Sequence, residues 1–199
     1  HVVEPPLADF VTIPDSGCAP LNVFFQNQST GYQNSYFWNF GNGQTSNAQQ
    51  PAPITFQQGQ FDTTYYPSLT AANICGINTM TDSVEVRAQP QANFIPNKYI
   101  GCSPVTISFT DNLTKGTPDT LIWFFGDTTA PLVTTQSTFS QPVQHTYTTG
   151  SSITQYTVTY IAKNSCGADT MTRQITVLPN TVDAFFNTDT LFGCPPLQV

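Results

Sequence analysis

The sequence predicts an all-β protein made of tandem β-sandwiches with about seven strands each. Only 9% of the residues are charged, and the chain is rich in Thr, Val, Tyr and Phe, which favour strands over helices. Short runs that alternate apolar and polar residues are separated by Gly, Asn, Asp and Pro at intervals of about 8–12 residues. The whole pattern occurs twice and then begins a third time, which indicates a repeated domain.

The repeat defines the expected domain boundaries. Three segments lead to a Cys-x-Pro element, at Cys18, Cys102 and Cys194. These cysteines are 84 and 92 residues apart, a spacing that fits a whole domain and exceeds that of a solenoid repeat. We therefore expect four parts: residues 1–5 as the end of a preceding repeat or a linker, 6–88 as a first unit, 89–179 as a second unit, and 180–199 as the start of a third unit.

Strands are expected in both halves of each unit. Residues 21–25 and 105–109 alternate apolar and polar side chains, as a strand with one buried face does. In the second halves, residues 65–86 align with residues 156–177 without a gap, at a constant offset of 91. The two units should therefore share one strand order.

Two differences between the units are expected to change this shared order locally. Pro67 takes the place of Val158 inside a strand, and proline cannot donate a hydrogen bond to a neighbouring strand, so we expect a bulge or a broken pairing there. The second unit is also longer around residues 129–140. Because insertions are tolerated best in loops, we expect a longer surface loop in that place.

The charge pattern and the lengths of the apolar runs argue against a nucleic-acid partner and against membrane insertion. The net charge is −7, and no cluster of Lys or Arg is present to replace the counterions of phosphates. No apolar run approaches the roughly 18–20 residues that a membrane helix needs. We expect neither a nucleic-acid partner nor membrane insertion.

The sequence offers no catalytic constellation. His145 is the one internal histidine, and it aligns with Ile54 or Thr55 of the first unit. No nucleophile elbow, zinc-protease motif or phosphate loop is present, and the cysteines never form a Cys-x-x-Cys pair. Asp119 and Asp127 could bind calcium, but the matching residues of the first unit are uncharged. We expect no catalytic residue, no cofactor and no metal site.

One motif carries a resemblance to a known family. Residues 36–43 read Tyr-Phe-Trp-Asn-Phe-Gly-Asn-Gly, residues 122–128 read Ile-Trp-Phe-Phe-Gly-Asp-Thr, and residues 142–147 read Pro-Val-Gln-His-Thr-Tyr. These runs resemble the signature of the PKD (polycystic kidney disease) domain, which reads Trp-Asp-Phe-Gly-Asp-Gly and then Pro-x-His-x-Tyr. The first unit has Asn at both Asp positions, and the second has Phe and Thr out of pattern. The resemblance covers nearly the whole chain and implies Ig-like sandwiches.

The added Cys-x-Pro and Asn-x-Cys-Gly elements resemble a variant of this domain in long surface proteins of gliding bacteria that use type IX secretion. That likeness implies an adhesin or filament in the extracellular space or at the cell surface. For His145 it implies a packing and hydrogen-bonding role near the tyrosine strand.

The motif residues also have structural roles that follow from their chemistry. A tryptophan between two sheets buries about 200 Å², and a phenylalanine two residues later points to the same side. The glycines supply turn conformations with positive φ. The core and turn signature comprises Trp38, Phe40, Gly41, Gly43, Trp123, Phe125, Gly126, Asp127, His145 and Tyr147.

The cysteines predict disulfides, because they recur at fixed repeat positions in a chain of secreted composition. In an Ig-type sandwich Cys18 lies at the pole nearest the next unit and Cys75 at the opposite pole, about 20 Å away. A disulfide needs Cα atoms within about 7 Å. We therefore favour a bond between neighbouring units, Cys18–Cys166, with Cys102 and Cys194 bonding further units. Pairing within each unit, Cys18–Cys75 and Cys102–Cys166, is the alternative.

A second recurrent pattern is Asp followed by Ser or Thr and then by Thr or an apolar residue. It resembles the O-glycosylation sequon of the same bacterial phylum. The alternative is that Asp-Thr pairs begin strands and cap turns. The candidate sites are Thr63, Ser83, Thr120, Thr128, Thr170 and Thr190.

We expect a non-catalytic structural stalk or spacer of an extracellular adhesin or filament, with short proline-containing connectors at residues 87–91 and 178–180. Its expected partners are the neighbouring repeats of the same chain and laterally associated copies, with any glycan or protein ligand bound elsewhere in the full chain. The alternative is a carbohydrate- or protein-binding accessory module of a secreted hydrolase. That function requires a row of exposed aromatics, for which Tyr32, Tyr36 and Phe61 are the candidates.

Overall fold

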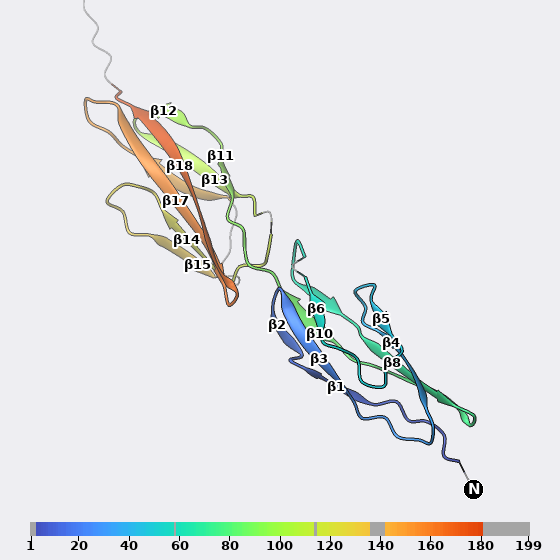
Figure 1. Ribbon diagram of the computed structural model, residues 1–199. Helices are drawn as coiled ribbons and strands as arrows, with labels where there is room; N and C mark the ends of the chain where they lie inside the picture. Colours follow the sequence, from blue (N-terminus) through green and yellow to red (C-terminus); the bar gives the residue numbers. More distant parts are fainter. Residues whose placement is uncertain (1–2, 58, 114, 136–141, 181–199) are drawn as a thin grey trace, which may run out of the picture.

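The computed structural model describes residues 3–57, 59–113, 115–135 and 142–180, which form two elongated β-sandwich units placed end to end (Figure 1). The described residues contain strands and turns and no helix. The first unit comprises β1 (Phe10–Ile13), β2 (Ser16–Cys18), β3 (Leu21–Asn27), β4 (Ser35–Asn39), β5 (Thr45–Ser46), β6 (Ile54–Phe56), β7 (Thr63–Tyr65), β8 (Ser68–Asn73), β9 (Gly76–Thr81) and β10 (Val84–Arg87). The second unit comprises β11 (Phe94–Pro96), β12 (Ile100–Cys102), β13 (Val105–Asp111), β14 (Thr120–Phe124), β15 (Leu132–Thr135), β16 (Val143–Tyr147), β17 (Thr154–Asn164) and β18 (Gly167–Leu178).

The sheets have corresponding orders in the two units. The first unit contains the sheets β1-β3-β6, β2-β10-β7 and β5-β4-β8-β9. The second unit contains β11-β13-β16 and the five-stranded sheet β12-β18-β17-β14-β15. Strand pairs are antiparallel except for β2 with β10 and β12 with β18, which are parallel. The described fold is therefore all-β, as the composition predicts, and its two successive units agree with the tandem sandwiches expected from the repeat.

Each unit has its own aromatic core. Trp38 is fully buried in the first unit, where the Phe10 ring lies 5.2 Å away in an edge-on arrangement. Trp123 is fully buried in the second unit, with the Tyr160 ring at 4.2 Å and the Phe94 ring at 5.2 Å. Such rings contribute most of the apolar area that a small sandwich can bury.

The strand that contains Pro67 is broken, which confirms the expected interruption. In the second unit β17 and β18 form one continuous hairpin from Thr154–Val177 to Asn164–Gly167. In the first unit the same stretch is divided into β7, which pairs with β10, and β8, which pairs with β9. Pro67 lies between them, where its ring nitrogen has no hydrogen to donate.

The longer segment of the second unit is only partly a loop. Its described residues include β15, which pairs with β14 from Thr120–Thr135 to Trp123–Leu132. The matching strand of the first unit, β5, is two residues long. The expectation of a plain surface loop over residues 129–140 is therefore corrected for 132–135, because Val and Thr in this stretch extend the sheet edge. Residues 136–141 lie outside the described residues.

Candidate functional site

His145 is held in a fixed orientation by its neighbours. Its Nε2 lies 2.7 Å from Oδ2 of Asp127, and its ring stacks on Phe125 with 3.9 Å between the centroids and 2° between the planes. The strand register pairs His145 with Ile107 and pairs Ile54 with Val23, so Ile54 is the matching residue of the first unit. The surroundings of His145 thus consist of packing and hydrogen-bonding partners.

The turn after Trp123 contacts β17 of its own sheet and β16 of the other sheet. Gly126 has φ +82°, and its missing side chain matters because a Cβ there would lie within 3 Å of the Thr157 backbone. The buried hydroxyl of Tyr147 donates a hydrogen bond of 3.0 Å to the carbonyl of Phe125. Burial raises the pKa of Asp127, but hydrogen bonds from Thr129 and His145 outweigh it, so the pKa lies below the ordinary value. Burial raises the pKa of Tyr147, which therefore stays protonated.

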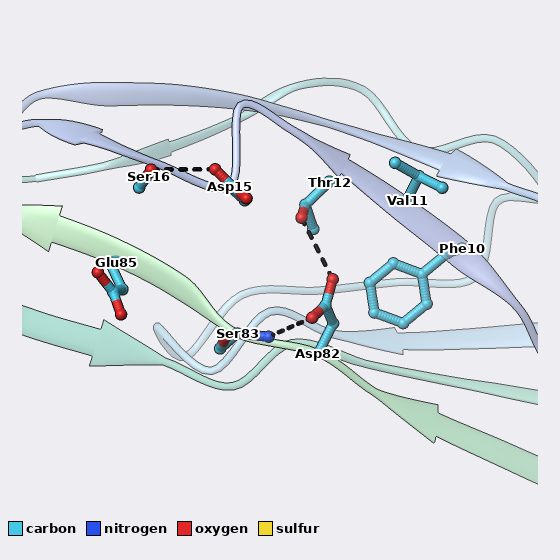
Figure 2. A pocket seen from close by; sticks show the side chains of 8 residues that line it. All are labelled: Phe10, Val11, Thr12, Asp15, Ser16, Asp82, Ser83 and Glu85. Carbon is cyan, nitrogen blue, oxygen red and sulfur yellow. Dashed lines mark hydrogen bonds between the residues drawn. The ribbon is translucent and has the colours of Figure 1, made fainter.

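A shallow acidic groove lies on the first unit beside β1 and β10 (Figure 2). Asp82 accepts hydrogen bonds from the Thr12 hydroxyl at 3.3 Å and from the Ser83 amide at 2.8 Å, while Ser16 donates to Asp15 at 3.0 Å. The groove is lined by Phe10, Val11, Thr12, Asp15, Ser16, Asp82, Ser83 and Glu85, which include no histidine, cysteine or lysine. In the part of the chain that the structure describes, no three His, Cys, Asp or Glu side chains converge as a metal site would require.

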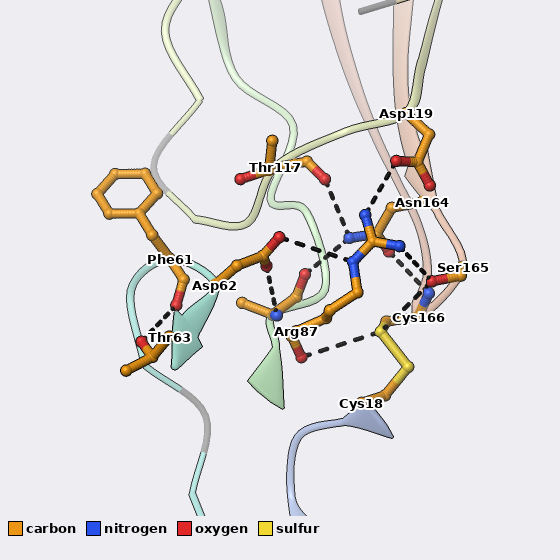
Figure 3. Close-up of polar contacts among 11 residues, drawn as sticks. Cys18, Phe61, Asp62, Thr63, Arg87, Thr117, Asp119, Asn164, Ser165 and Cys166 are labelled. Atoms are coloured by element: carbon orange, nitrogen blue, oxygen red, sulfur yellow. Dashed lines mark hydrogen bonds and ion pairs between the residues drawn. A yellow bond between two sulfur atoms is a disulfide. The ribbon is translucent and has the colours of Figure 1, made fainter. Parts of the chain in front are cut away.

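The most highly organised site of the molecule is the joint, which we define as the connector residues 87–91 and the ends of the two units that contact them. A disulfide bond there joins Cys18, the last residue of β2, to Cys166 in the turn between β17 and β18 (Figure 3). The two Cα atoms are 5.4 Å apart, although 148 residues separate them along the chain. This is the bond favoured from the repeat pattern. The alternative pairs Cys18–Cys75 and Cys102–Cys166 do not occur, because Cys18 and Cys166 bond each other.

Arg87 connects both units from the end of β10. Its Nη2 lies 2.9 Å from Oδ1 of Asp119, and its Nη1 donates to the Ser165 hydroxyl at 2.8 Å, both in the second unit. Its Nε lies 3.7 Å from Oδ2 of Asp62 in the first unit. The hydrogen bond with Asp119 is the main reason why the pKa of Arg87 is raised. These groups are about one-third to one-half exposed, so each pair contributes at most about 1 kcal/mol and mainly selects one orientation.

Asn164 of the second unit holds the connector through hydrogen bonds of its side chain. Its side chain is buried, and its Nδ2 donates to the carbonyls of Ala88 at 2.8 Å and Thr117 at 3.1 Å. Its Oδ1 accepts the amide of Cys166 at 2.8 Å and thereby shapes the disulfide turn. The Ala88 amide in turn donates to Asp62 of the first unit at 2.8 Å. Ala88 is thus hydrogen-bonded to both units through its own backbone.

Close backbone contact completes the joint. Gly116 has φ +67°, and a Cβ at this position would lie 2.7 Å from the backbone of Gln89 and Pro90. The Gly116 amide also donates to the carbonyl of Gln60 across the joint at 2.9 Å. A larger residue would push the connector away, so glycine is needed for this approach.

Among the described residues, the other two cysteines form no disulfide bond. Cys75 and Cys102 are exposed free thiols. Cys194 lies outside the described residues, as does the candidate glycosylation site Thr190. Of the other candidates, Thr63, Ser83, Thr128 and Thr170 are exposed, and Thr120 is half-buried in β14.

The three candidate aromatics do not form a row. Phe61 is 51% exposed and lies beside Asp62 at the joint. Tyr32 is 59% exposed and lies at the other end of the unit, where its carbonyl accepts a hydrogen bond from Asn73. Tyr36 packs against the core. Tyr32, Tyr36 and Phe61 therefore do not form the row of exposed aromatics that an accessory binding module requires.

No family model matches the chain, and no curated protein is significantly similar to it in sequence. Among solved structures, the full ectodomain (Ig1–Ig3) of mouse nectin-like molecule 4 aligns over 93% of this chain and 69% of its own, with 13% identity and a TM-score of 0.57. Immunoglobulin domains 1–4 of Sidekick-1 align over 91% of this chain and 50% of their own, with 12% identity and a TM-score of 0.51.

The N-terminal four Ig domains of Dscam1 isoform 6.44 give 89% and 47% coverage, 10% identity and a TM-score of 0.51. This chain spans about half the length of the Sidekick-1 and Dscam1 chains. At these identities the likeness shows the fold, which is that of tandem Ig-like sandwiches. The PKD resemblance remains a prediction from the sequence. Within the described residues, no helix is long and apolar enough to span a membrane.

Proposed function

We propose that this chain is a non-catalytic spacer segment of an extracellular bacterial stalk or filament, with residues 6–88 and 89–179 as successive PKD-type units. The observation that carries the proposal is the joint, in which a disulfide, an arginine held by both units and a buried asparagine all fix one connector. A structure that only tethers two independent domains has no use for these restraints. A structure that must keep its direction under load requires them.

The disulfide is the strongest of these restraints. It closes a loop across two units, and in the chain-entropy model a loop of about 150 residues stabilises the closed form by about 5 kcal/mol before strain is subtracted. A pull along the stalk passes through the connector and, beside it, through the Cys18–Cys166 bond. Bending at the joint would therefore have to deform two covalent paths.

An extracellular location agrees with the chemistry of the joint. Disulfides persist in oxidising compartments and are rare in the reducing cytosol of most organisms. The low charge and the many hydroxyl residues suit a surface protein that is decorated with glycans. Lateral association of such stalks is part of the same proposal.

Small-angle X-ray scattering tests the proposed stiffness. We compare the oxidised chain with the Cys18→Ser/Cys166→Ser double variant and with a matched Cys75→Ser/Cys102→Ser variant that loses two free thiols. The loss of the joint disulfide should broaden the distribution of inter-unit distances and leave the circular dichroism spectrum of the sandwiches unchanged, whereas the matched variant should scatter like the parent. Equal scattering from all three proteins would show that the disulfide does not stiffen the joint.

The Asp-Ser and Asp-Thr positions extend the proposal to modification. We propose O-linked sugar at Thr63, Ser83, Thr128 and Thr170, because their side chains are exposed and recur after Asp. The turn-capping alternative also has support, since Asp127 and Asp82 accept hydrogen bonds from nearby backbone amides. Glycopeptide mass spectrometry of protein from its native source should find hexose-containing peptides at these positions. Unmodified peptides at every position would assign the Asp residues to turn capping.

A further inference from the structure

The far pole of the first unit, which we define as Asn73, Ile74 and Cys75 with the residues around them, repeats the accepting side of the joint. Asn73 Nδ2 donates to the Glu4 carbonyl at 2.9 Å, as Asn164 Nδ2 donates to the Ala88 carbonyl at 2.8 Å. Glu4 and Ala88 are separated by one repeat step of 84 residues. The segment around Glu4 therefore occupies the far pole as the connector occupies the joint.

Cys75 has the surroundings of a bonded cysteine. Its amide donates to Asn73 Oδ1 at 2.8 Å, and its Sγ lies 3.2 Å from the Val3 carbonyl. At the joint, the Cys166 amide donates to Asn164 Oδ1 at 2.8 Å, and its Sγ lies 3.9 Å from the Arg87 carbonyl. Val3 and Arg87 are again 84 residues apart, so the two turns have the same construction.

The strand that would deliver a partner sulfur is defined by the joint. Arg87 pairs with Cys18 across β10 and β2, and the Ala19 amide donates to the Arg87 carbonyl at 2.9 Å. This pairing is what places Cys18 next to Cys166. A Cys-x-Pro strand paired with Val3 in the same register would place its cysteine next to Cys75.

The rim of the far pole, which we define as Val3, Asn34 and Ile74, differs from the joint at all three positions. Ile74 stands where Ser165 stands, and Asn34 stands where Asp119 stands, as the strand registers show. Val3 likewise replaces Arg87. The ionic and polar set of the joint is thus replaced by an uncharged set that contains two apolar residues. Ile74 is 90% exposed, which leaves a large apolar side chain next to a free thiol.

Cys102 presents the complementary half at the opposite end of the second unit. It pairs with Leu178 across β12 and β18, and the Ser103 amide donates to the Leu178 carbonyl at 2.9 Å. These are the relations that Cys18 and Ala19 have with Arg87. Cys102 is exposed and bonded to no other cysteine among the described residues.

We propose that the far pole is a docking surface for another copy of this repeat unit, whose Cys-x-Pro cysteine forms a disulfide with Cys75, and that Cys102 offers the same bond to the unit that follows. This inference rests on the proposed spacer function, since it extends the joint to both ends. The two sites differ at the rim: Val3 and Ile74 are apolar at the far pole, whereas Arg87 donates a hydrogen bond to Ser165 at the joint.

The bond forms by two thiol–disulfide exchanges with a small-molecule disulfide such as oxidised glutathione. The first cysteine thiolate attacks the glutathione disulfide and releases one reduced glutathione. The second cysteine thiolate then attacks the mixed disulfide and releases the other. Overall, two protein thiols lose two electrons and two protons, which the two glutathione molecules take up.

An extension that keeps the repeat step tests the proposal; below, the complete chain means its residues 3–199. Residues 1–86 are placed directly before residues 3–199, so that Val86 is followed by Val3 and the repeat step is kept. The protein is equilibrated in a glutathione redox buffer, alkylated and mapped by peptide mass spectrometry. We expect Cys18 of the added copy to bond Cys75 of the complete chain. Cys75 of the added copy should stay a free thiol and should therefore be found alkylated.

Two matched variants identify the partner, because both copies carry identical peptides. Cys75→Ser in the complete chain should abolish the Cys18–Cys75 cross-link, and Cys75→Ser in the added copy should leave it intact. The opposite result would show a bond within one unit and overturn the proposal. Alkylation of Cys75 in both copies would overturn it as well, and the spacer function would still stand as long as the Cys18–Cys166 bond is present.

The rim is tested separately with Ile74→Asp in the complete chain. Replacing this apolar side chain with a carboxylate removes its apolar contact with the docked unit and should reduce the equilibrium constant of the new disulfide against glutathione at least tenfold, while Ile74→Val should change it less than threefold. The Cys18–Cys166 bond in the same molecule is the internal control. Equal equilibrium constants for both variants would show that Ile74 does not contact a docked unit.

Discussion

The two units differ most in one hairpin, although they share their core and strand order. In the second unit β17 and β18 pair without interruption over eleven positions. In the first unit the matching hairpin divides, and its two halves belong to different sheets. The residue that differs at the break is Pro67 in place of Val158. A single missing amide hydrogen is thus compatible with the fold when the residues on either side of it pair in two different sheets.

The neighbouring residues show how the break is accommodated. The carbonyl of Pro67 still accepts the Asp82 amide at 3.0 Å, and Asp82 bonds the Thr12 hydroxyl of β1. In the second unit the residue at the Asp82 position is Arg173, whose Nε donates to the Phe94 carbonyl at 2.7 Å and whose guanidinium lies 5.6 Å from the Phe94 ring centre. The first strand of each unit, β1 or β11, is therefore linked to this hairpin by a side chain. Asp82 makes the link in the first unit and Arg173 makes it in the second.

The largest effect should come from removing the shared core. Trp38→Ala and Trp123→Ala each delete a fully buried ring, which costs about 3–5 kcal/mol and approaches the whole stability of so small a domain. Each substitution should unfold its own unit and leave the other folded. Hydrogen-exchange mass spectrometry measures this, because peptides from the two units are distinct. Protection that stays unchanged in the mutated unit would mean that the tryptophan does not hold the core.

The hairpin comparison can be broken with Val158→Pro. Val158 is fully buried in the middle of β17, so the substitution removes an amide hydrogen and buried methyl groups from a continuous ladder. We expect a loss of about 3 kcal/mol in the unfolding free energy of the second unit.

The reverse change, Pro67→Val, is the control. It should alter the stability of the first unit by less than about 1 kcal/mol, because the residues on either side of Pro67 already pair in separate sheets. Denaturant unfolding with exchange detection compares the two. If Val158→Pro proved as mild as Pro67→Val, the continuity of the hairpin would not matter for the second unit.

A smaller effect separates the units by their response to acid. The pKa of Asp127 is lowered, so its carboxylate stabilises the second unit above its unfolded pKa of about 3.9, and this contribution is lost as the pH falls through the lower folded value. Asp127→Asn should therefore cost about 1–2 kcal/mol at pH 7 and almost nothing near pH 2.

The first unit supplies the matched control for this acid response. It has Asn42 and Ile54 at the positions of Asp127 and His145, so Asn42→Asp places a carboxylate in the same turn without a histidine partner. This variant keeps the bond from the Gln44 amide but lacks the Thr129 hydroxyl and the histidine, so it should acquire less acid-sensitive stability than Asp127 provides. Unfolding free energies measured from pH 2 to pH 7 decide, and a cost of Asp127→Asn that is independent of pH would show that the ionised carboxylate is not its cause.

The sequence predicted the features that repeat. Alternation and turn glycines predict the strands, the offset of 91 residues predicts the interruption at Pro67, and the poles of an Ig-type sandwich favour the Cys18–Cys166 bond. The network around Arg87 was missed because it has no repeat signal: Leu178 takes the matching position, and Asp62, Asp119 and Ser165 are far from Arg87 in sequence. Asn164 aligns with Asn73 in the sequence, but its role depends on the Ala88 carbonyl, which no side-chain pattern reveals.

The smallest expected effect concerns a difference in charge at the end of a shared strand. Asp111 ends β13 where Asn27 ends β3, and both accept an amide two residues ahead, from Leu113 and Ser29 respectively. Burial raises the pKa of Asp111, and its hydrogen bonds offset only part of this rise. A raised folded pKa means that the ionised carboxylate destabilises the unit at neutral pH, and that this penalty disappears below the unfolded pKa.

Asp111→Asn keeps the turn bond without the charge, so it should stabilise the second unit by up to about 1 kcal/mol at pH 7 and by nothing near pH 3. Thermal unfolding at the two pH values measures the difference, and Asn27→Asp in the first unit should change stability in the opposite direction. A gain from Asp111→Asn that is equal at both pH values would instead assign it to packing.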